Sequence, residues 1–133
     1  MTQDDAARCD AVAQWLLRAQ ADLDYAVLGA KAGHIHPNLI CFHLQQCTEK
    51  ALKAVLMNRG LGVPRTHDLT DLAARLVGVE PALPAMGLLS VLSPFGSVER
   101  YPSTGDVPGP MEVEAFKVAT VQVLDWAKSA TKT

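Results

Sequence analysis

Residues 39–60, LICFHLQQCTEKALKAVLMNRG, decide the fold of this chain. Strong helix formers dominate the stretch, and its apolar residues recur at steps of three and four, which places them on one stripe of a helix. These residues are Ile40, Leu44, Cys47, Ala51 and Val55. Pro37 and Asn38 mark the start of the predicted helix, and Gly60 provides its stop. Burying one Leu or Val side chain contributes about 1.5–3 kcal/mol, so we expect this stripe to pack against partner helices.

A second stripe of the same helix is polar and partly cationic. Its members are His43, Gln46, Lys50 and Lys53. For each residue taken singly, the pattern favours a solvated helix face with His43 partly packed. The alternative is that the stripe as a whole meets a phosphate or a carboxylate on a partner. Glu49 and Lys53 stand four residues apart in the order that favours an ion pair, worth about 0.2–0.5 kcal/mol.

The composition limits the class of fold and of ligand. The chain has 133 residues, enough for one domain with a real core, and we expect a single domain over residues 1–133 with a core at about 9–129. Aromatic residues make up only 5%, which favours helices over a sandwich or barrel. The net charge of −2 means that any RNA contact has to rely on a local patch.

Cysteine usage and hydropathy indicate a cytoplasmic protein. Cys41 and Cys47 lie six residues apart on one helix and point to different sides, so with Cys9 they are expected to be reduced thiols. The first residues, MTQDDAARCD, lack the apolar core of a signal peptide. No apolar run approaches the ~20 residues that span a bilayer, so we expect no membrane contact.

The rest of the chain also reads as helices. After a frayed lead-in over residues 1–8, a long helix is predicted over residues 10–31, antiparallel to residues 39–60 because the connector is short. Thr66 is the predicted N-cap of a short third helix that ends at Gly78. Residues 79–95 suggest a short or irregular fourth helix, and residues 93–110 a long functional loop before a last helix that starts at Pro110. The predicted fold is an all-α, up-and-down bundle of four or five helices.

Four strings in this order carry a resemblance to a known family. They are AQADLDYA in the first helix, CFHLQQCTEKALKAVL in the second, GLGVPRTHDLTDL after it, and ERYP in the late loop. Together they resemble the HEPN domain (higher eukaryotes and prokaryotes nucleotide-binding) over roughly residues 12–128. The resemblance implies a helical bundle that pairs as a homodimer and acts with a small nucleotidyltransferase in toxin–antitoxin or stress systems.

Some members of that family are metal-independent ribonucleases with an Arg and a His separated by four to six residues. This chain departs from that pattern: seven residues separate Arg59 from His67, and Arg65 lies only two positions before His67. The resemblance is therefore to the branch that lacks the nuclease motif, and Arg100 and Tyr101 in the late loop fit that branch.

Several side chains are candidates for ligand or partner binding. They are His43, Gln46, Lys50, Lys53, Arg65, His67, Arg100 and Tyr101. His67 is a weak catalytic candidate, because in the first turn of the third helix a neutral imidazole can act as a base, or it can simply fix the turn. Arg100 and Tyr101 belong either to a binding lid or to a loop in which Tyr101 packs on the bundle. His34 and His36 lack further ligands, so no metal is expected, and no cofactor motif occurs.

Two functions follow, from different classes. The first is a dimeric interaction module with a small nucleotidyltransferase partner, which is not itself an enzyme. The second is an RNA- or nucleotide-binding protein, and if it is an enzyme, a metal-independent ribonuclease with a non-standard site. In that case Arg65, Lys50, Lys53 and Arg100 would neutralise phosphate, and His67 would move the proton of the 2′-hydroxyl. Trp15 and Trp126 stand at core spacing, which favours packing over base stacking.

Overall fold

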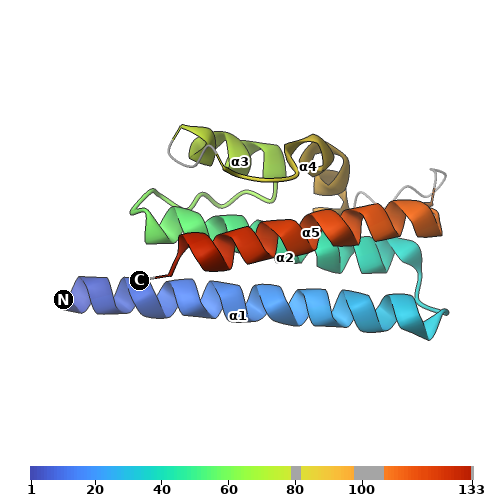
Figure 1. Ribbon diagram of the computed structural model, residues 1–133, viewed down its shortest axis with the longest axis horizontal. Coiled ribbons are helices and arrows are strands. Elements are labelled where there is room, and N and C mark those ends of the chain that lie inside the picture. The colour runs from blue at the N-terminus through green and yellow to red at the C-terminus, as the bar shows by residue number, and fades with distance from the viewer. Residues whose placement is uncertain (79–81, 98–106, 133) are drawn as a thin grey trace.

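The computed structural model describes residues 1–78, 82–97 and 107–132, and these residues form helices and no strand. The helices are α1 (Gln3–Ala32), α2 (Pro37–Asn58), α3 (Leu69–Val77), α4 (Met86–Leu92), the 3-10 helix η1 (Ser93–Gly96) and α5 (Pro110–Ala130). The predicted all-α bundle is confirmed. α1 and α2 are antiparallel, α5 runs in the same direction as α2, and both chain ends lie at one end of the molecule (Figure 1).

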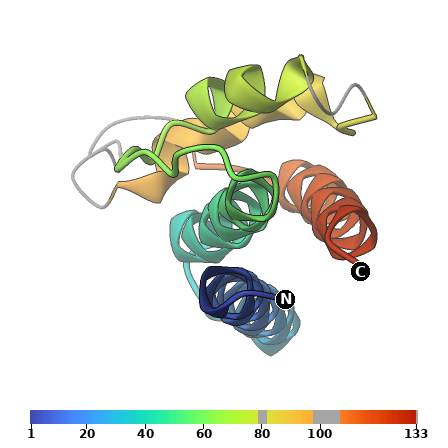
Figure 2. The same ribbon diagram turned by 90° about the vertical axis from the view of Figure 1, so that its left-hand side faces the viewer.

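α2 is the central helix of the bundle. Seen end-on, it lies between α1 on one side, α5 on another, and the layer of α3 and α4 on a third (Figure 2). All five residues of its predicted apolar stripe are buried, as are Leu52 and Leu56. Three neighbours need more apolar surface than one stripe offers, which is why fourteen residues of α2 are buried.

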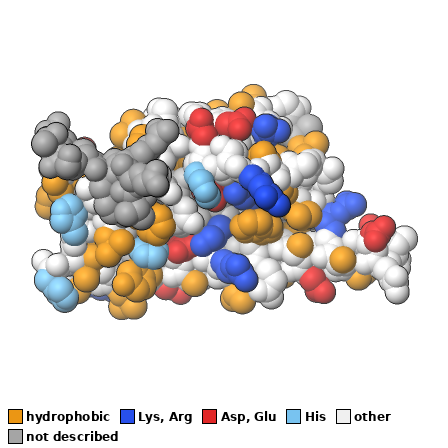
Figure 3. Space-filling model, turned by 180° about the vertical axis from the view of Figure 1, so that it is seen from behind, with side chains coloured by type: hydrophobic (Ala, Val, Ile, Leu, Met, Phe, Trp, Pro, Cys, Tyr) orange, Lys and Arg blue, Asp and Glu red, His pale blue; other side chains and the backbone are white. Residues whose placement is uncertain are grey.

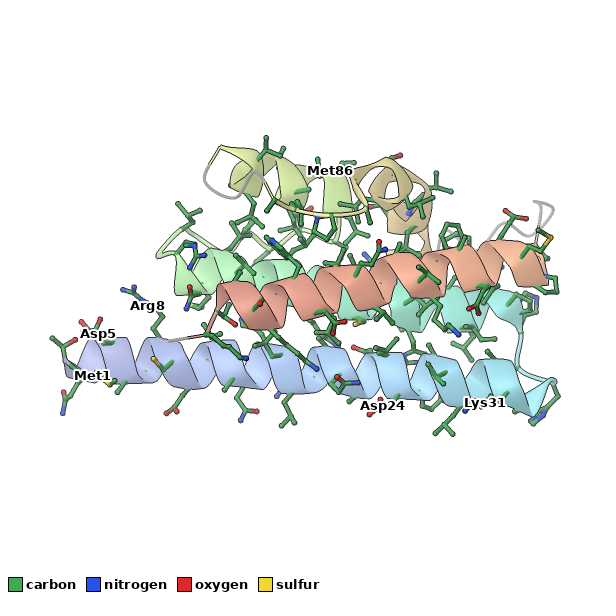
Figure 4. The ribbon with its side chains drawn as sticks, in the orientation of Figure 1. Met1, Asp5, Arg8, Asp24, Lys31 and Met86 are labelled. Atoms are coloured by element: carbon green, nitrogen blue, oxygen red, sulfur yellow. The ribbon has the colours of Figure 1, made fainter. Side chains whose placement is uncertain are left out.

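The start of α1 differs from the prediction. Residues 3–8 are helical rather than frayed, because Thr2 and Asp5 form a capping box. The Thr2 hydroxyl accepts from the Asp5 amide at 3.0 Å, and the Asp5 carboxylate accepts from the Thr2 amide at 3.1 Å. The hydrogen bond that the Asp5 carboxylate receives from the Thr2 amide lowers the pKa of Asp5. The labelled side chains of Met1, Asp5 and Arg8 mark this first part of α1 in Figure 4.

The third helix begins two residues later than expected. Its N-cap is Asp68, whose carboxylate accepts from the amides of Thr70 and Asp71. Thr66, the predicted N-cap, instead accepts from the Asp68 amide at 3.1 Å. Asp68 is the N-cap in place of Thr66 because its carboxylate accepts from two free amides and carries the negative charge that the start of a helix favours. His67 therefore lies before the helix, and the prediction that it occupies the first turn is wrong.

The described part of the segment after α3 contains one more helical element than the sequence predicted. A short fourth helix is confirmed as α4, and the beginning of the predicted loop forms η1. The hydroxyl of Ser93, the first residue of η1, accepts from the Leu69 amide at 2.9 Å, so η1 is tied to the start of α3. Residues 98–106, which are half of the predicted loop, lie outside the described residues.

α5 closes the bundle along α2. Its start at Pro110 is as predicted, and the Glu112 carboxylate accepts from the Gly109 amide at 3.2 Å. Its buried residues include Phe116, Thr120, Leu124 and Ala127, which recur at steps of four, four and three. The Thr120 hydroxyl is hydrogen-bonded to Thr48 of α2 at 3.3 Å inside the core. No helix in the described part of the chain is long and apolar enough to cross a bilayer.

We expect the three thiols to differ strongly in reactivity. Cys9 is exposed, whereas Cys41 and Cys47 are buried and all three are unpaired. Burial raises the pKa of both buried thiols from 9.0 to about 12, which lowers their thiolate fraction about 1000-fold near neutral pH. Titration with a disulfide reagent at about pH 8 should show one fast thiol in the native protein and three in guanidinium chloride. Fast reaction of a second thiol in the native protein would contradict this burial.

Candidate functional site

The polar stripe of α2 is largely engaged within the chain. His43 Nδ1 lies 3.0 Å from Oδ1 of Asp22 on α1, and Lys50 Nζ is bound to the other oxygen of the same carboxylate. The rings of Tyr25 and Phe42 enclose His43, with centroids at 4.4 and 5.1 Å. Gln46 donates to the side-chain oxygen of its neighbour Gln45 at 2.8 Å. His43 and Lys50 are thus committed to Asp22 rather than free for a phosphate.

Lys53 contradicts the expectation of an open cationic stripe. Its side chain is 8% exposed, and Nζ lies 3.1 Å from Oε2 of Glu49, whose side chain is 5% exposed. The ammonium group also lies 5.7 Å from the centre of the Trp15 ring on α1, within range of a cation–π contact. Because α1 and the segment after α2 cover this part of the helix, Lys53 is a buried structural partner and not a ligand contact.

Glu49 connects this buried pair to His67. Oε1 of Glu49 accepts from His67 Nδ1 at 2.9 Å and from the Gln45 amide at 3.4 Å. The Gln45 amide also donates to the backbone oxygen of His67 at 2.8 Å, so it fixes that backbone as well. The His67 side chain remains 69% exposed. A buried carboxylate therefore orients a histidine whose other ring nitrogen, Nε2, points away from Glu49.

A cleft of about 600 Å³ opens beside His67. One wall is the segment from Arg65 to Thr70. The other is formed by Ser90 of α4, by Ser93, Pro94 and Gly96 of η1, and by Ser97, which follows η1. Its size falls within the range of small-molecule sites. On the face turned away from α5, Lys, Arg and His side chains gather near the middle (Figure 3). The structure thus brings Arg65 and His67 together in one cleft.

Some residues that the sequence singled out lie away from the cleft or outside the described residues. Arg100 and Tyr101 lie outside the described residues, so the structure does not place them. Trp15 and Trp126 are half-buried, and Trp126 packs against the core. His36 caps α2, accepting from the Asn38 amide at 3.1 Å. In the ranges that the structure describes, no three His, Cys, Asp or Glu side chains are grouped to hold a metal ion.

Glu49, Gln45 and Asp22 were not predicted as site residues. A signal for the first two was present, because Gln45 and Glu49 share one helical stripe with Leu52 and Leu56. Polar residues on a stripe that continues as leucine are expected to be buried and hydrogen-bonded. No such pattern singles out Asp22, since its partners are 21 and 28 residues away.

We expect Gly96→Ala to destabilise the protein by about 1–3 kcal/mol, measured by urea denaturation. A Cβ atom at Gly96 would lie 2.5 Å from Cδ of Gln45, whose amide is buried and held by the hydrogen bonds described above. Gly87→Ala is the matched control: nothing lies within 4 Å of its added Cβ, and Ala in place of Gly inside α4 should stabilise by about 0.5–1 kcal/mol. A neutral Gly96→Ala would show that Gln45 can move.

Fold and site together define a small all-α bundle domain with a polar cleft next to its central helix. The family model of the HEPN domain matches residues 12–130, and the chain belongs to this family. No curated protein matches the sequence.

Two solved structures share the fold. ST0689, described as an archaeal HEPN homologue, is 25% identical with a TM-score of 0.71, over 91% of this chain and 98% of that one. TT1696 from Thermus thermophilus is 24% identical with a TM-score of 0.70, over 90% of this chain and 97% of that one. The matched length shows that the bundle described here is nearly the whole of each of those chains.

Proposed function

We propose that this HEPN domain is a dimeric interaction module that acts with a small nucleotidyltransferase in a toxin–antitoxin or stress-related system. One observation carries the proposal: α1 presents two large apolar side chains to the outside. Leu17 is 65% exposed and Leu28 is 67% exposed. Meanwhile the cationic side chains of the α2 stripe are paired within the chain, which supports a protein-binding role over a phosphate-binding one for this helix.

The outward face of α1 suits a second copy of the same chain. Leu17 and Leu28 are eleven residues apart, about three helical turns, so they lie on one stripe with Ala21 and Asp24 between them. Asp24 points away from α2 in Figure 4. In an antiparallel two-fold pairing of α1 helices, Leu17 of one copy can face Leu28 of the other, as an isologous interface requires.

The dimer is tested by light scattering after size exclusion. Wild-type protein is expected at twice the mass of one chain, and Leu17→Glu with Leu28→Glu is expected at the mass of one chain, because each introduced carboxylate would face a carboxylate of the other copy and lose water across the interface. Val91→Glu is the control: Val91 is also half exposed, but on α4. If the wild-type protein has the mass of one chain at every concentration measured, the proposed dimer is refuted.

The partner is tested separately. Tagged chain purified from its native host is expected to bring down a small nucleotidyltransferase in stoichiometric amount, identified by mass spectrometry. If the Leu17→Glu, Leu28→Glu variant no longer brings down the nucleotidyltransferase, the partner binds either the dimer or the outward face of α1. Recovery of a lone dimer from native host extract would refute the partnership while leaving the dimer intact.

A second candidate function is binding of RNA or a nucleotide, with ribonuclease activity at a non-standard site. The Glu49–His67 pair beside the cleft favours it, since a carboxylate that orients an imidazole is a common arrangement for moving a proton. Incubation of labelled RNA with the protein is the test. Cleavage that survives EDTA and is lost in His67→Ala would favour this function over the first, and intact RNA would exclude the nuclease.

A further inference from the structure

We propose that the cleft between the Arg65–Thr70 segment and η1 binds a phosphate monoester carried on a sugar, with Arg65 and His67 at the phosphate. The inference rests on the second candidate function for its site and adds the chemical class of the ligand. Three observations carry it: an unpaired guanidinium, an oriented imidazole, and a cleft wall made of hydroxyl side chains.

Arg65 supplies the cationic side chain among the described residues that line the cleft. It is exposed and lines the cleft, and within the described ranges it makes no ion pair or hydrogen bond. Lys50 and Lys53 differ, because each is bound to a carboxylate, as is Arg75 to Asp71 at 3.2 Å. The planar guanidinium offers a fork of donors that matches two oxygens of one phosphate. Within the described part of the chain, Arg65 thus keeps its guanidinium donors for an anion, whereas Arg75, in the last turn of α3, is paired with Asp71.

His67 complements Arg65. Its Nδ1 must carry hydrogen to donate to Glu49, since a carboxylate only accepts. The hydrogen bond to Glu49 therefore sets the tautomer of the His67 ring. That hydrogen bond and the one from Gln45 to the His67 backbone fix the orientation of the ring. Nε2 is left for the ligand: it donates to a phosphate oxygen when the ring is protonated and accepts from a hydroxyl when it is neutral. A phosphate next to a hydroxyl satisfies both states.

The other groups of the cleft favour a sugar beside that phosphate. Hydroxyls of Thr70, Ser90 and Ser97 can donate or accept. Asp68 is also in the wall, and the hydrogen bond from the Thr70 side chain holds its pKa below the ordinary value, so it stays ionised at neutral pH. A carboxylate repels a bare phosphate but accepts from sugar hydroxyls. The charge arrangement therefore suits a sugar phosphate better than inorganic phosphate.

Two sources supply this chemistry: a free nucleotide or sugar phosphate, and the phosphorylated end of an RNA. They are separated by titrating isotope-labelled protein, followed by amide and imidazole resonances, with four probes. The probes are inorganic phosphate, ribose 5-phosphate, adenosine 5′-monophosphate, and a short RNA with or without a 5′-phosphate. Ribose 5-phosphate is expected to shift resonances of residues 65–70 at lower concentration than inorganic phosphate does.

Variants then assign the contacts. Arg65→Gln and His67→Gln are both at exposed positions, so folding should be kept, and each is expected to weaken binding of ribose 5-phosphate about tenfold. Arg75→Gln is the matched control, because Arg75 is an exposed arginine on α3 outside the cleft, and its binding should equal wild type. Equal losses in Arg65→Gln and Arg75→Gln would show general charge attraction and overturn the proposal.

The results of these titrations distinguish a failure of the proposed phosphate site from a failure of RNA or nucleotide binding as such. RNA that binds equally with and without its 5′-phosphate would overturn the monoester site while leaving RNA binding in place. Absence of resonance shifts with every probe would overturn both. Preference for the phosphorylated RNA over adenosine 5′-monophosphate would assign the site to RNA ends, and the reverse preference to free nucleotides.

Discussion

Glu49→Ala is expected to lower the free energy of unfolding by about 3–5 kcal/mol, because it leaves the buried Lys53 ammonium without its carboxylate. Both side chains are buried, with Nζ and Oε2 at 3.1 Å. The substitution also removes the acceptor for His67 and Gln45. Alanine is the stronger helix former, so helix propensity works against the loss. Urea denaturation followed by far-ultraviolet circular dichroism measures it.

A double variant separates the ion pair from the packing. In Glu49→Leu, Lys53→Met both charges are replaced by apolar side chains of similar length, and stability should return to within about 1–2 kcal/mol of wild type. Lys53→Met alone should cost less than Glu49→Ala, since Glu49 keeps the hydrogen bonds from His67 and Gln45. A Glu49→Ala protein that unfolds at the wild-type urea concentration would mean that water reaches Lys53.

Leu44→Ala is expected to cost about 3–5 kcal/mol, through lost apolar transfer energy and the cavity left behind. Leu44 is fully buried in the middle of α2, where neighbouring helices leave little freedom to collapse onto the gap. The same urea titration measures the loss. Thermal unfolding should shift in the same direction, because the cavity destabilises only the folded state.

The control for Leu44→Ala is Val91→Ala. Val91 is 52% exposed on α4, so its truncation should change stability by no more than about 0.5 kcal/mol. A Leu44→Ala loss as small as the control would contradict the position of Leu44 at the centre of the bundle. It would also mean that α2 is not the helix around which the bundle packs.

The helices could be predicted because their signals are local. The steps of three and four in residues 39–60 predict the buried face of α2, and all five positions are buried. The structure shows the same spacing on the buried face of α3, at Leu69, Leu72, Ala73 and Leu76. Helix ends were less predictable, since neighbouring side chains compete for the same free amides. Thr66 and Asp68 both fit an N-cap by type, and only the folded chain shows that Asp68 holds it.

The candidate site was harder to predict than the fold. The sequence pointed to Arg65 and His67, and the structure places both in one cleft. It could not show that Lys53 and Glu49 are buried together, because a polar stripe can equally face water or a neighbouring helix. Nor could it pair Lys50 with Asp22, which lies on a different helix. Long-range partners of charged side chains depend on how helices pack, and periodicity carries no information on that.

The sequence by itself determined that this chain is an all-α bundle with one face of residues 39–60 in the core, because apolar periodicity and helix propensity are properties of single segments. The resemblance of its motif strings to the HEPN family identified the type of bundle. Only the tertiary structure decided which polar groups remain available. Packing α1 and the segment after α2 against the lysine-bearing stripe removed Lys53 from solvent and tied Lys50 to Asp22. Burial of a charge costs more than its exposure unless a partner is supplied, so the fold had to use those carboxylates internally, and Arg65 and His67 were left facing the cleft.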